Sequence, residues 1–238
     1  RKIHDQPIPL AGGLAVLSGL ALPLLVGVSL FALRALPGHE HWLDPATVPL
    51  LTYGLSHRAI QLGAIVLGAL AMVGIGLLDD KHELRPGPKF GCQLLVALLV
   101  AAAGVRITLF VPNVSFSFAI TVLWILTVTN ALNFMDNMNG LCAGLGAIGA
   151  GFFALIAAGD GQYLVALLAF LTCGALVGFL PYNFPKASAF LGDSGSHLVG
   201  YLLAVLAILP HFYSSRYPQV LAVFSPLLIL AVPLLDLA

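Results

Sequence analysis

Long stretches without a charged side chain alternate with short polar segments along most of the chain. Several such stretches contain at least 20 residues each, about the length of helix that crosses the ~30 Å hydrocarbon layer of a bilayer. They include residues 10–33, 59–78, 137–159, 161–185 and 194–215, as well as 107–135, which Pro112 and Asn113 interrupt. Together with the Pro and Gly breaks, this pattern predicts eight transmembrane helices. We expect them at residues 11–33, 59–78, 90–109, 115–133, 140–158, 163–181, 195–211 and 217–235.

The composition favours an all-α membrane protein. Of the 238 residues, 60% are hydrophobic and 8% are charged, whereas soluble domains carry about 25% charged residues. Ten basic residues balance ten acidic ones, so no excess of positive charge indicates nucleic-acid binding. The spacing of Cys92, Cys142 and Cys173 suits neither a zinc site nor a disulfide framework. We therefore expect a polytopic transmembrane helical bundle that forms one integral-membrane domain over residues 1–238.

The polar segments can be assigned to two sides of the membrane by counting the helices between them. Residues 1–9, 79–89, 129–139 and 183–194 are each separated from the next by two predicted crossings, so all four emerge on one side. This side carries six Lys or Arg residues, against four on the other. Because a positive excess is typical of the cytoplasmic face, we expect these four segments to face the cytoplasm.

Acidic residues gather on the same side. Seven of the ten lie in or beside these segments if the last helix returns inward, namely Asp5, Asp79, Asp80, Glu83, Asp136, Asp193 and Asp236. An unpaired charge near hydrocarbon costs about 3 kcal/mol, so this grouping favours a functional site over scattered solvated helix ends. Carboxylates such as Asp79 and Asp80 bind Mg²⁺ together with substrate phosphates. A solvated helix end beside Lys81 is the alternative explanation for this pair.

A second polar motif consists of Asn130, Asn133, Asp136 and Asn139, spaced three residues apart. On a continuous helix these positions drift slowly around one face. The amides can hydrogen-bond a sugar or a base, and Asp136 or Asn139 can bind a cation. A capped helix end accounts for one or two of these residues but not for all four.

A third motif, Phe-Leu-Gly-Asp-Ser-Gly-Ser-His, occupies residues 190–197 before an apolar run. Asp193 suits a helix N-cap, and Gly192 and Gly195 allow the backbone to approach a ligand closely. The N–H groups at such a helix start favour a phosphate. A plain cap explains the same residues, and both interpretations can hold together. His197 lies one turn beyond Asp193, where we expect it to support Asp193 rather than bind the ligand.

In this order, the motifs resemble those of the polyprenyl-phosphate N-acetylhexosamine-1-phosphate transferases, glycosyltransferase family 4. The resemblance rests on Arg-Lys-Ile-His-Asp-Gln-Pro-Ile-Pro-Leu-Ala-Gly-Gly (1–13), on 77–80 with Lys89 and Gln93, on 130–140 and on 190–196. The opening motif is most similar to that of the undecaprenyl-phosphate GlcNAc-1-phosphate transferase branch. The family's bundle has ten or eleven helices. The resemblance therefore implies that a first helix, a His-rich loop and the last helix or helices lie outside this sequence.

The resemblance also implies a reaction. Members of the family transfer a sugar 1-phosphate from a UDP-sugar to a polyprenyl phosphate, release UMP and use Mg²⁺ or Mn²⁺. For this chain it implies transfer of GlcNAc-1-phosphate to undecaprenyl phosphate at the cytoplasmic face of the inner (plasma) membrane, starting a cell-envelope glycan. The expected partners are the UDP-sugar donor, the polyprenyl phosphate acceptor and membrane lipid, and a homodimer stays open.

Individual roles follow from the same resemblance. It implies Asp79, Asp80 and Asp193 as catalytic residues, with one of the paired aspartates deprotonating the lipid phosphate. It implies Asp193 as a metal ligand together with Asn139, where many bacterial members have Asp and the eukaryotic enzyme has a metal-binding Asn. The residues that it implies for substrate binding are Lys89, Asn130, Asn133, Asp136, Gly192, Ser194 and Ser196.

Other functions stay open at this point. Another UDP-N-acetylhexosamine or UDP-MurNAc-pentapeptide would undergo the same chemistry. A secondary transporter accounts for the helices and the polar groups, although the acidic groups here lie at helix ends. Gly192-Asp193 resembles part of the Gly-x-Gly-Asp motif of intramembrane aspartyl proteases, but Phe190 stands where that motif has Gly. With Asn139 in place of Asp, a catalytically inactive scaffold is a further alternative.

Overall fold

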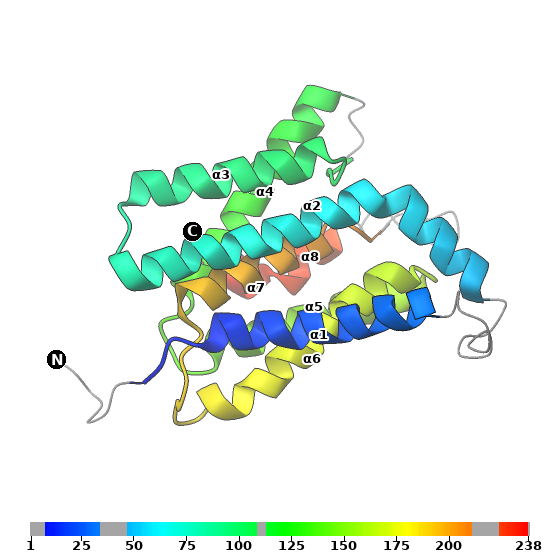
Figure 1. Ribbon diagram of the computed structural model, residues 1–238. Coiled ribbons are helices and arrows are strands. Elements are labelled where there is room, and N and C mark those ends of the chain that lie inside the picture. The colour runs from blue at the N-terminus through cyan, green and yellow to red at the C-terminus, as the bar shows by residue number, and fades with distance from the viewer. Residues whose placement is uncertain (1–7, 34–46, 109–112, 211–223, 238) are drawn as a thin grey trace.

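The computed structural model describes residues 8–33, 47–108, 113–210 and 224–237 (Figure 1). Over these residues the chain forms helices and no strands, which confirms the predicted all-α class. The helices are α1 (Gly12–Leu33), α2 (Thr47–His82), α3 (Pro86–Ala102), α4 (Val114–Phe134), α5 (Leu141–Gly159), α6 (Tyr163–Asn183), α7 (Gly192–Leu206), α8 (Ser225–Ile229) and α9 (Ala231–Leu237).

Within the described ranges, five helices are long and apolar enough to cross a membrane, namely α1, α2, α4, α5 and α6. The chain is therefore a multi-pass membrane protein. The prediction of eight spans is met only in part. α3 is apolar but 17 residues long, α7 has 15 residues, and the described part of the eighth predicted helix is divided at Leu230 into α8 and α9.

Helix α7 lies at the centre of the bundle. Every one of its residues except Asp193 is buried, and it packs against α1, α2, α4 and α5. Figure 1 shows it between α2 and α1, with α3 and α4 beyond α2 and with α6 beside α1. Because protein rather than lipid surrounds α7, this helix can carry polar groups into the bundle.

The four polar segments predicted to share one side do so over the described residues. α1, α3, α5 and α7 begin, and α2, α4 and α6 end, at the left of Figure 1. The backbone joins two of these segments directly. Gly12 N donates to Phe190 O at 3.0 Å, and Phe190 N donates to Pro9 O at 3.0 Å. Residues 1–7, which begin the first motif and include Asp5, lie outside the described residues.

Two helix boundaries differ from the prediction for physical reasons. α2 begins at Thr47 instead of residue 59, because its polar turn around Arg58 is an exposed part of the helix rather than a loop. α3 ends at Ala102 instead of residue 109. There Gly104 adopts a φ of 93°, and the N–H of Val105 bonds back to Val100 O at 3.2 Å, which is how glycine commonly closes a helix end.

Candidate active site

Close helix packing brings α1 and α2 against the first turn of α7. A Cβ added at Gly76 of α2 would lie 2.3 Å from backbone atoms of Ser194, and one at Gly13 of α1 would lie 2.4 Å from Ser194 Oγ. Protein interiors are close-packed, so no larger side chain fits at these positions without displacing α7. The carboxylates at the end of α2 are thereby held beside the start of α7.

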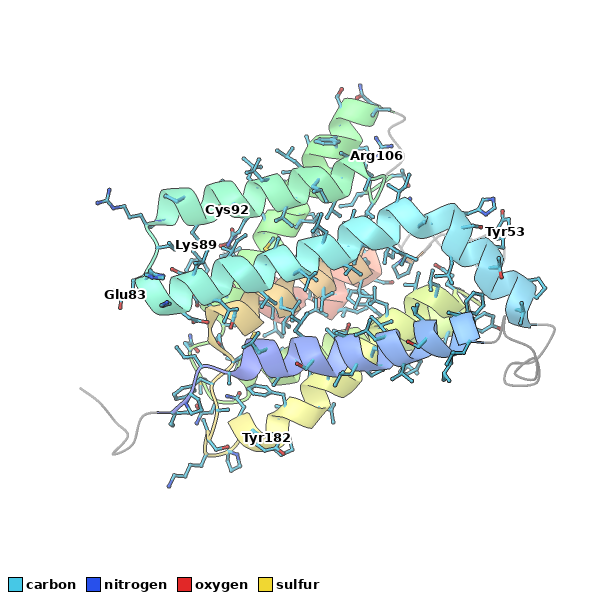
Figure 2. All side chains as sticks on the ribbon, viewed as in Figure 1. Tyr53, Glu83, Lys89, Cys92, Arg106 and Tyr182 are labelled. Atoms are coloured by element: carbon cyan, nitrogen blue, oxygen red, sulfur yellow. The ribbon has the colours of Figure 1, made fainter. Side chains whose placement is uncertain are left out.

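Lys89 of α3 links the carboxylates of two other helices. Its Nζ lies 2.5 Å from Asp79 Oδ2 and 2.9 Å from Asp193 Oδ2, and it donates to Asn133 Oδ1 at 3.4 Å. Figure 2 shows Lys89 between α3 and α2 at the end of the bundle where α7 begins. Partly buried ion pairs are screened less than exposed ones. The Lys89 cation therefore offsets the repulsion between Asp79 and Asp193.

Asp193 is held at both carboxylate oxygens and at its backbone. Asn133 Nδ2 of α4 donates to Asp193 Oδ1 at 2.9 Å and to Ser196 Oγ at 2.9 Å, while Lys89 binds Oδ2. His197 Nδ1 lies 2.5 Å from Asp193 O, so His197 contacts the backbone of Asp193, whereas its role towards a ligand stays a prediction. The side chain of Asp193 is still 35% exposed, which leaves it accessible to a ligand.

Asp80 of α2 does not pair with Lys89 and binds the backbone of α7. Its Oδ1 accepts from Asp193 N at 2.8 Å and its Oδ2 accepts from Ser194 N at 3.1 Å. Two predictions about this helix start are therefore corrected. Asp193 is the second residue of α7 rather than its N-cap, and the two amides expected to favour a phosphate already bind a side chain of the protein.

A cavity of about 260 Å³ opens beside Asp193. It is lined by Leu10, Asp80, Asp136, Asn137, Met138, Asn139, Asn183, Phe190, Gly192 and Asp193. Burial, together with the nearby charges of Asp193 and Asp80, raises the pKa of Asp136 to about 7. Asn139 is exposed and donates from Nδ2 to Pro185 O at 3.3 Å. The cavity thus combines carboxylates with amides that can hydrogen-bond a polar ligand.

The remaining predicted substrate contacts lie deeper. Ser194 and Ser196 are completely buried and contact neighbouring helices rather than the cavity. Asn130 donates to Gln93 Oε1 at 2.8 Å and does not line the cavity. Lys89 and Asn133 do not line the cavity themselves but bond to the carboxylate of Asp193, which does. Of the residues predicted to bind substrate, Gly192 and Asp136 line the cavity directly.

Asn183, which the sequence motifs did not identify, lines the cavity at the end of α6. Its Oδ1 accepts from Gly140 N at 2.7 Å and its Nδ2 donates to Ala189 O at 3.0 Å. These bonds tie the polar turn after α4 to the segment before α7. An amide at the end of an apolar run, on the side where the other motifs gather, is the signal that could have identified it.

The carboxylate and amide oxygens that line the cavity are of the kind that bind a hard divalent cation. The described residues contain no group of three or more His, Cys, Asp or Glu side chains placed to hold a metal ion. Mg²⁺ commonly binds one or two protein carboxylates and completes its shell with water and substrate phosphates. Asp193, with Asp136 and Asn139 lining the same cavity, offers oxygen ligands of this kind.

Comparison with known proteins gives consistent matches. The model of the family described as Glycosyl transferase family 4 matches residues 62–211. A probable undecaprenyl-phosphate N-acetylglucosaminyl 1-phosphate transferase of Bacillus subtilis (strain 168) is 32% identical over 99% of this chain and 60% of the relative. A decaprenyl-phosphate N-acetylglucosaminephosphotransferase of Mycobacterium tuberculosis (strain ATCC 25618 / H37Rv) is 32% identical over 100% of this chain and 60% of the relative.

A second type of relative matches a shorter region. A phospho-N-acetylmuramoyl-pentapeptide-transferase of Lacticaseibacillus paracasei is 39% identical over 57% of this chain and 46% of that relative. The chain spans about 60% of the length of the two relatives that it matches throughout.

Proposed function

The chain belongs to glycosyl transferase family 4, and we propose that it transfers a sugar 1-phosphate from a UDP-sugar to a polyprenyl phosphate. The observation that carries this proposal is the cluster of Asp79, Lys89 and Asp193, which three helices bring together beside a cavity. GlcNAc-1-phosphate is the favoured donor group and undecaprenyl phosphate the favoured acceptor, because the Bacillus subtilis relative carries both in its name. A MurNAc-pentapeptide donor is the alternative, given the Lacticaseibacillus relative.

In this reaction an oxygen of the lipid phosphate attacks the sugar-bearing phosphorus of the donor. A new P–O bond forms, the bond to the nucleotide's phosphate breaks, and UMP leaves. Both substrates are anions, so the chemistry depends on positioning and on charge neutralisation. A bound Mg²⁺ or Mn²⁺ would neutralise charge on the diphosphate. Asp193 would hold that ion together with Asn139 or Asp136, and Lys89 keeps the Asp193 carboxylate in place.

We assign the site to the cytoplasmic face of the plasma (inner) membrane. The end of the bundle that carries the site belongs to the side with six of the ten basic residues, and positive charge is enriched in cytoplasmic segments. A site at the helix ends serves both substrates, because a nucleotide sugar arrives from water while a lipid phosphate stays in the bilayer plane. A homodimer stays a prediction.

The test follows UMP release in membranes that contain the full-length protein, undecaprenyl phosphate, UDP-GlcNAc and Mg²⁺. We expect metal-dependent UMP, and at least a ~100-fold loss of turnover for Asp193→Asn, because a single strong electrostatic group is removed. Asp160→Asn is the matched control, since Asp160 is exposed at the opposite end of the bundle. Absence of UMP with GlcNAc and with a panel of other UDP-sugars would overturn the proposal. Near-normal turnover of Asp193→Asn would show that the Asp193 carboxylate is not needed for the reaction.

A further inference from the structure

We propose that Asp80 is a positioning residue, whose carboxylate fixes the first turn of α7 and with it Asp193, and that it does not act as the base in the reaction. This inference deepens the proposed function and depends on it only for its kinetic consequence. It differs from the role implied by the sequence resemblance, in which one of Asp79 and Asp80 takes a proton from the lipid phosphate.

The first observation is that Asp80 has its two oxygens on two successive amides of α7. The first N–H groups of a helix have no acceptor within the helix. In α7 the N–H of Asp193 donates to Asp80 Oδ1 and the N–H of Ser194 donates to Asp80 Oδ2. Negative charge is also favoured at this end of a helix by the helix dipole. The carboxylate therefore acts as a cap supplied by another helix.

The second observation is that the backbone is shaped for this contact. Gly192 adopts a φ of 71°, and a Cβ at this position would lie 3.0 Å from Asp80 Oδ2. Glycine allows both the unusual φ and the close approach. The Gly192 amide also bonds to the Asp136 carboxylate. Three successive amides of α7 thus bind carboxylates of the protein itself.

The third observation is that the adjacent Asp79 carboxylate bonds to groups outside the α7 backbone. Asp79 Oδ1 accepts from Leu84 N at 2.7 Å, and its Oδ2 pairs with Lys89. The two neighbouring carboxylates therefore fix different parts of the site. Asp79 orients the Lys89 cation and the turn after α2, whereas Asp80 orients the backbone that carries Asp193.

The reaction does not require a base at Asp80. A phosphate monoester has its second pKa near about 6, so most of a polyprenyl phosphate is already fully ionised at neutral pH. What the reaction does require is an accurately placed Asp193, since a misplacement of ~1 Å in a reacting group costs up to ~100-fold in rate. Asp80 is located where it meets this requirement through two hydrogen bonds.

The decisive experiment is hydrogen–deuterium exchange of the full-length protein, read by mass spectrometry on peptides covering residues 79–89 and 190–197. In the wild-type chain we expect the amides of Asp193 and Ser194 to be protected. Asp80→Asn keeps the size of the side chain but leaves only one acceptor oxygen. Exchange at the amide of Asp193 or Ser194 that loses its acceptor should therefore rise at least ~10-fold, while exchange at Leu84 stays unchanged. Asp79→Asn, the matched variant, should raise exchange at the Leu84 amide and leave exchange at the Asp193 and Ser194 amides unchanged.

Kinetics provide a readout that a general loss of folding would not reproduce. We expect Asp80→Asn to lower kcat by ~10- to 100-fold at every pH and to retain the acid limb of the kcat/KM profile, because that limb reports the substrate phosphate. Loss of the acid limb in this variant would identify Asp80 as a titrating base and overturn the inference. Rapid exchange of the Asp193 and Ser194 amides in the wild-type chain would overturn it even if the variant does not fold. If the wild-type protein releases no UMP, the proposed function fails while the exchange data still decide the role of Asp80.

Discussion

Asp136 illustrates how the surroundings of a single residue control charge at the cavity. Its pKa is raised from 3.8 to about 7 by burial and by the charges of Asp193 and Asp80. Between these two values the folded chain holds a proton that the unfolded chain has released. The native state then binds more protons than the unfolded state, so the free energy of unfolding falls as pH rises across this window.

We therefore expect Asp136→Asn to remove a pH-dependent part of the stability. In the unmodified protein the contribution of Asp136 is fully present below about pH 3.8 and is lost as pH rises through about 7. An Asn side chain does not titrate, so the variant should lose less stability across that range. Thermal unfolding in detergent, followed across the range, measures the difference, and Asp160→Asn is the exposed control. Equal pH slopes in the wild type and Asp136→Asn would contradict the prediction.

Lys89 permits a second prediction at the residue scale. Lys89→Met leaves Asp79 and Asp193 close to each other without the intervening cation. We expect turnover to fall by at least ~100-fold and the melting temperature to drop, since partly buried carboxylates then repel each other. Lys89→Arg keeps the charge but not the compact geometry of the ammonium group, so its turnover should be intermediate.

The control for this series is Lys186→Met, because Lys186 is exposed and forms no ion pair with the described part of the chain. Its UMP release and melting temperature should match those of the wild type. Wild-type turnover in Lys89→Met would show that the bridge is not needed for activity.

At the scale of helices, the contact between α2 and α7 depends on the absence of a side chain at Gly76. A Cβ there would lie 2.3 Å from the α7 backbone, whereas a Cβ at Gly74 on the same helix meets nothing within 4 Å. We expect Gly76→Ala to lower the melting temperature and to reduce UMP release, because α7 must shift and Asp80 then loses its place on the α7 amides.

Gly74→Ala is the matched variant for this helix contact. Ala is favoured over Gly within a helix by about 1 kcal/mol, so this variant should be as stable as the wild type or slightly more stable. The comparison measures the cost of the contact apart from the general effect of adding a methyl group to α2. Equal melting temperatures for the two variants would contradict the role of Gly76.

Local pattern predicted most helices well but not their environment. The apolar run ending before Asp79 located the C-terminal end of α2 to within a few residues, because charged side chains do not continue far into lipid. The polar turn around Arg58 hid the other end of α2, since a helix that leaves the bilayer continues in water without an apolar pattern. The run after Gly195 has the composition of a lipid-facing helix. Only tertiary contacts reveal that α7 is the buried centre of the bundle.

The same distinction applies to the candidate site. Counting helix crossings was enough to group the carboxylates at one end, because topology alone sets the side on which a loop emerges. It could not determine that adjacent Asp79 and Asp80 bind Lys89 and the α7 amides respectively, since these partners come from other helices. Nor could it show that Ser194 and Ser196 turn inward. Those outcomes depend on side-chain directions that only the assembled bundle fixes.

At the scale of the whole molecule, the candidate site lies at one of the two polar ends of a bundle whose flanks are apolar. Figure 2 shows Glu83, Lys89 and Tyr182 at one end, with Arg106 and Tyr53 at the other. Large apolar side chains such as Leu25, Leu123 and Leu155 are exposed along the helices between the two ends. A surface of this kind is stable only in contact with lipid, so the two ends must face opposite aqueous compartments.

This arrangement predicts which residues a membrane-impermeant thiol reagent can reach. Lys186 lies in the connection before α7 at the site end, and Asp160 follows α5 at the opposite end, and both are exposed. In a chain whose three native cysteines are replaced by Ala, Lys186→Cys should be labelled only when the cytoplasmic face is accessible, as in inverted vesicles. Asp160→Cys should be labelled from outside intact cells.

Labelling of both variants from the same side would contradict the predicted topology. The reverse pattern would agree with the bundle but place the site on the outer face of the membrane. UDP-sugars are charged and do not cross the bilayer, so the orientation also decides whether a cytosolic nucleotide sugar can reach Asp193.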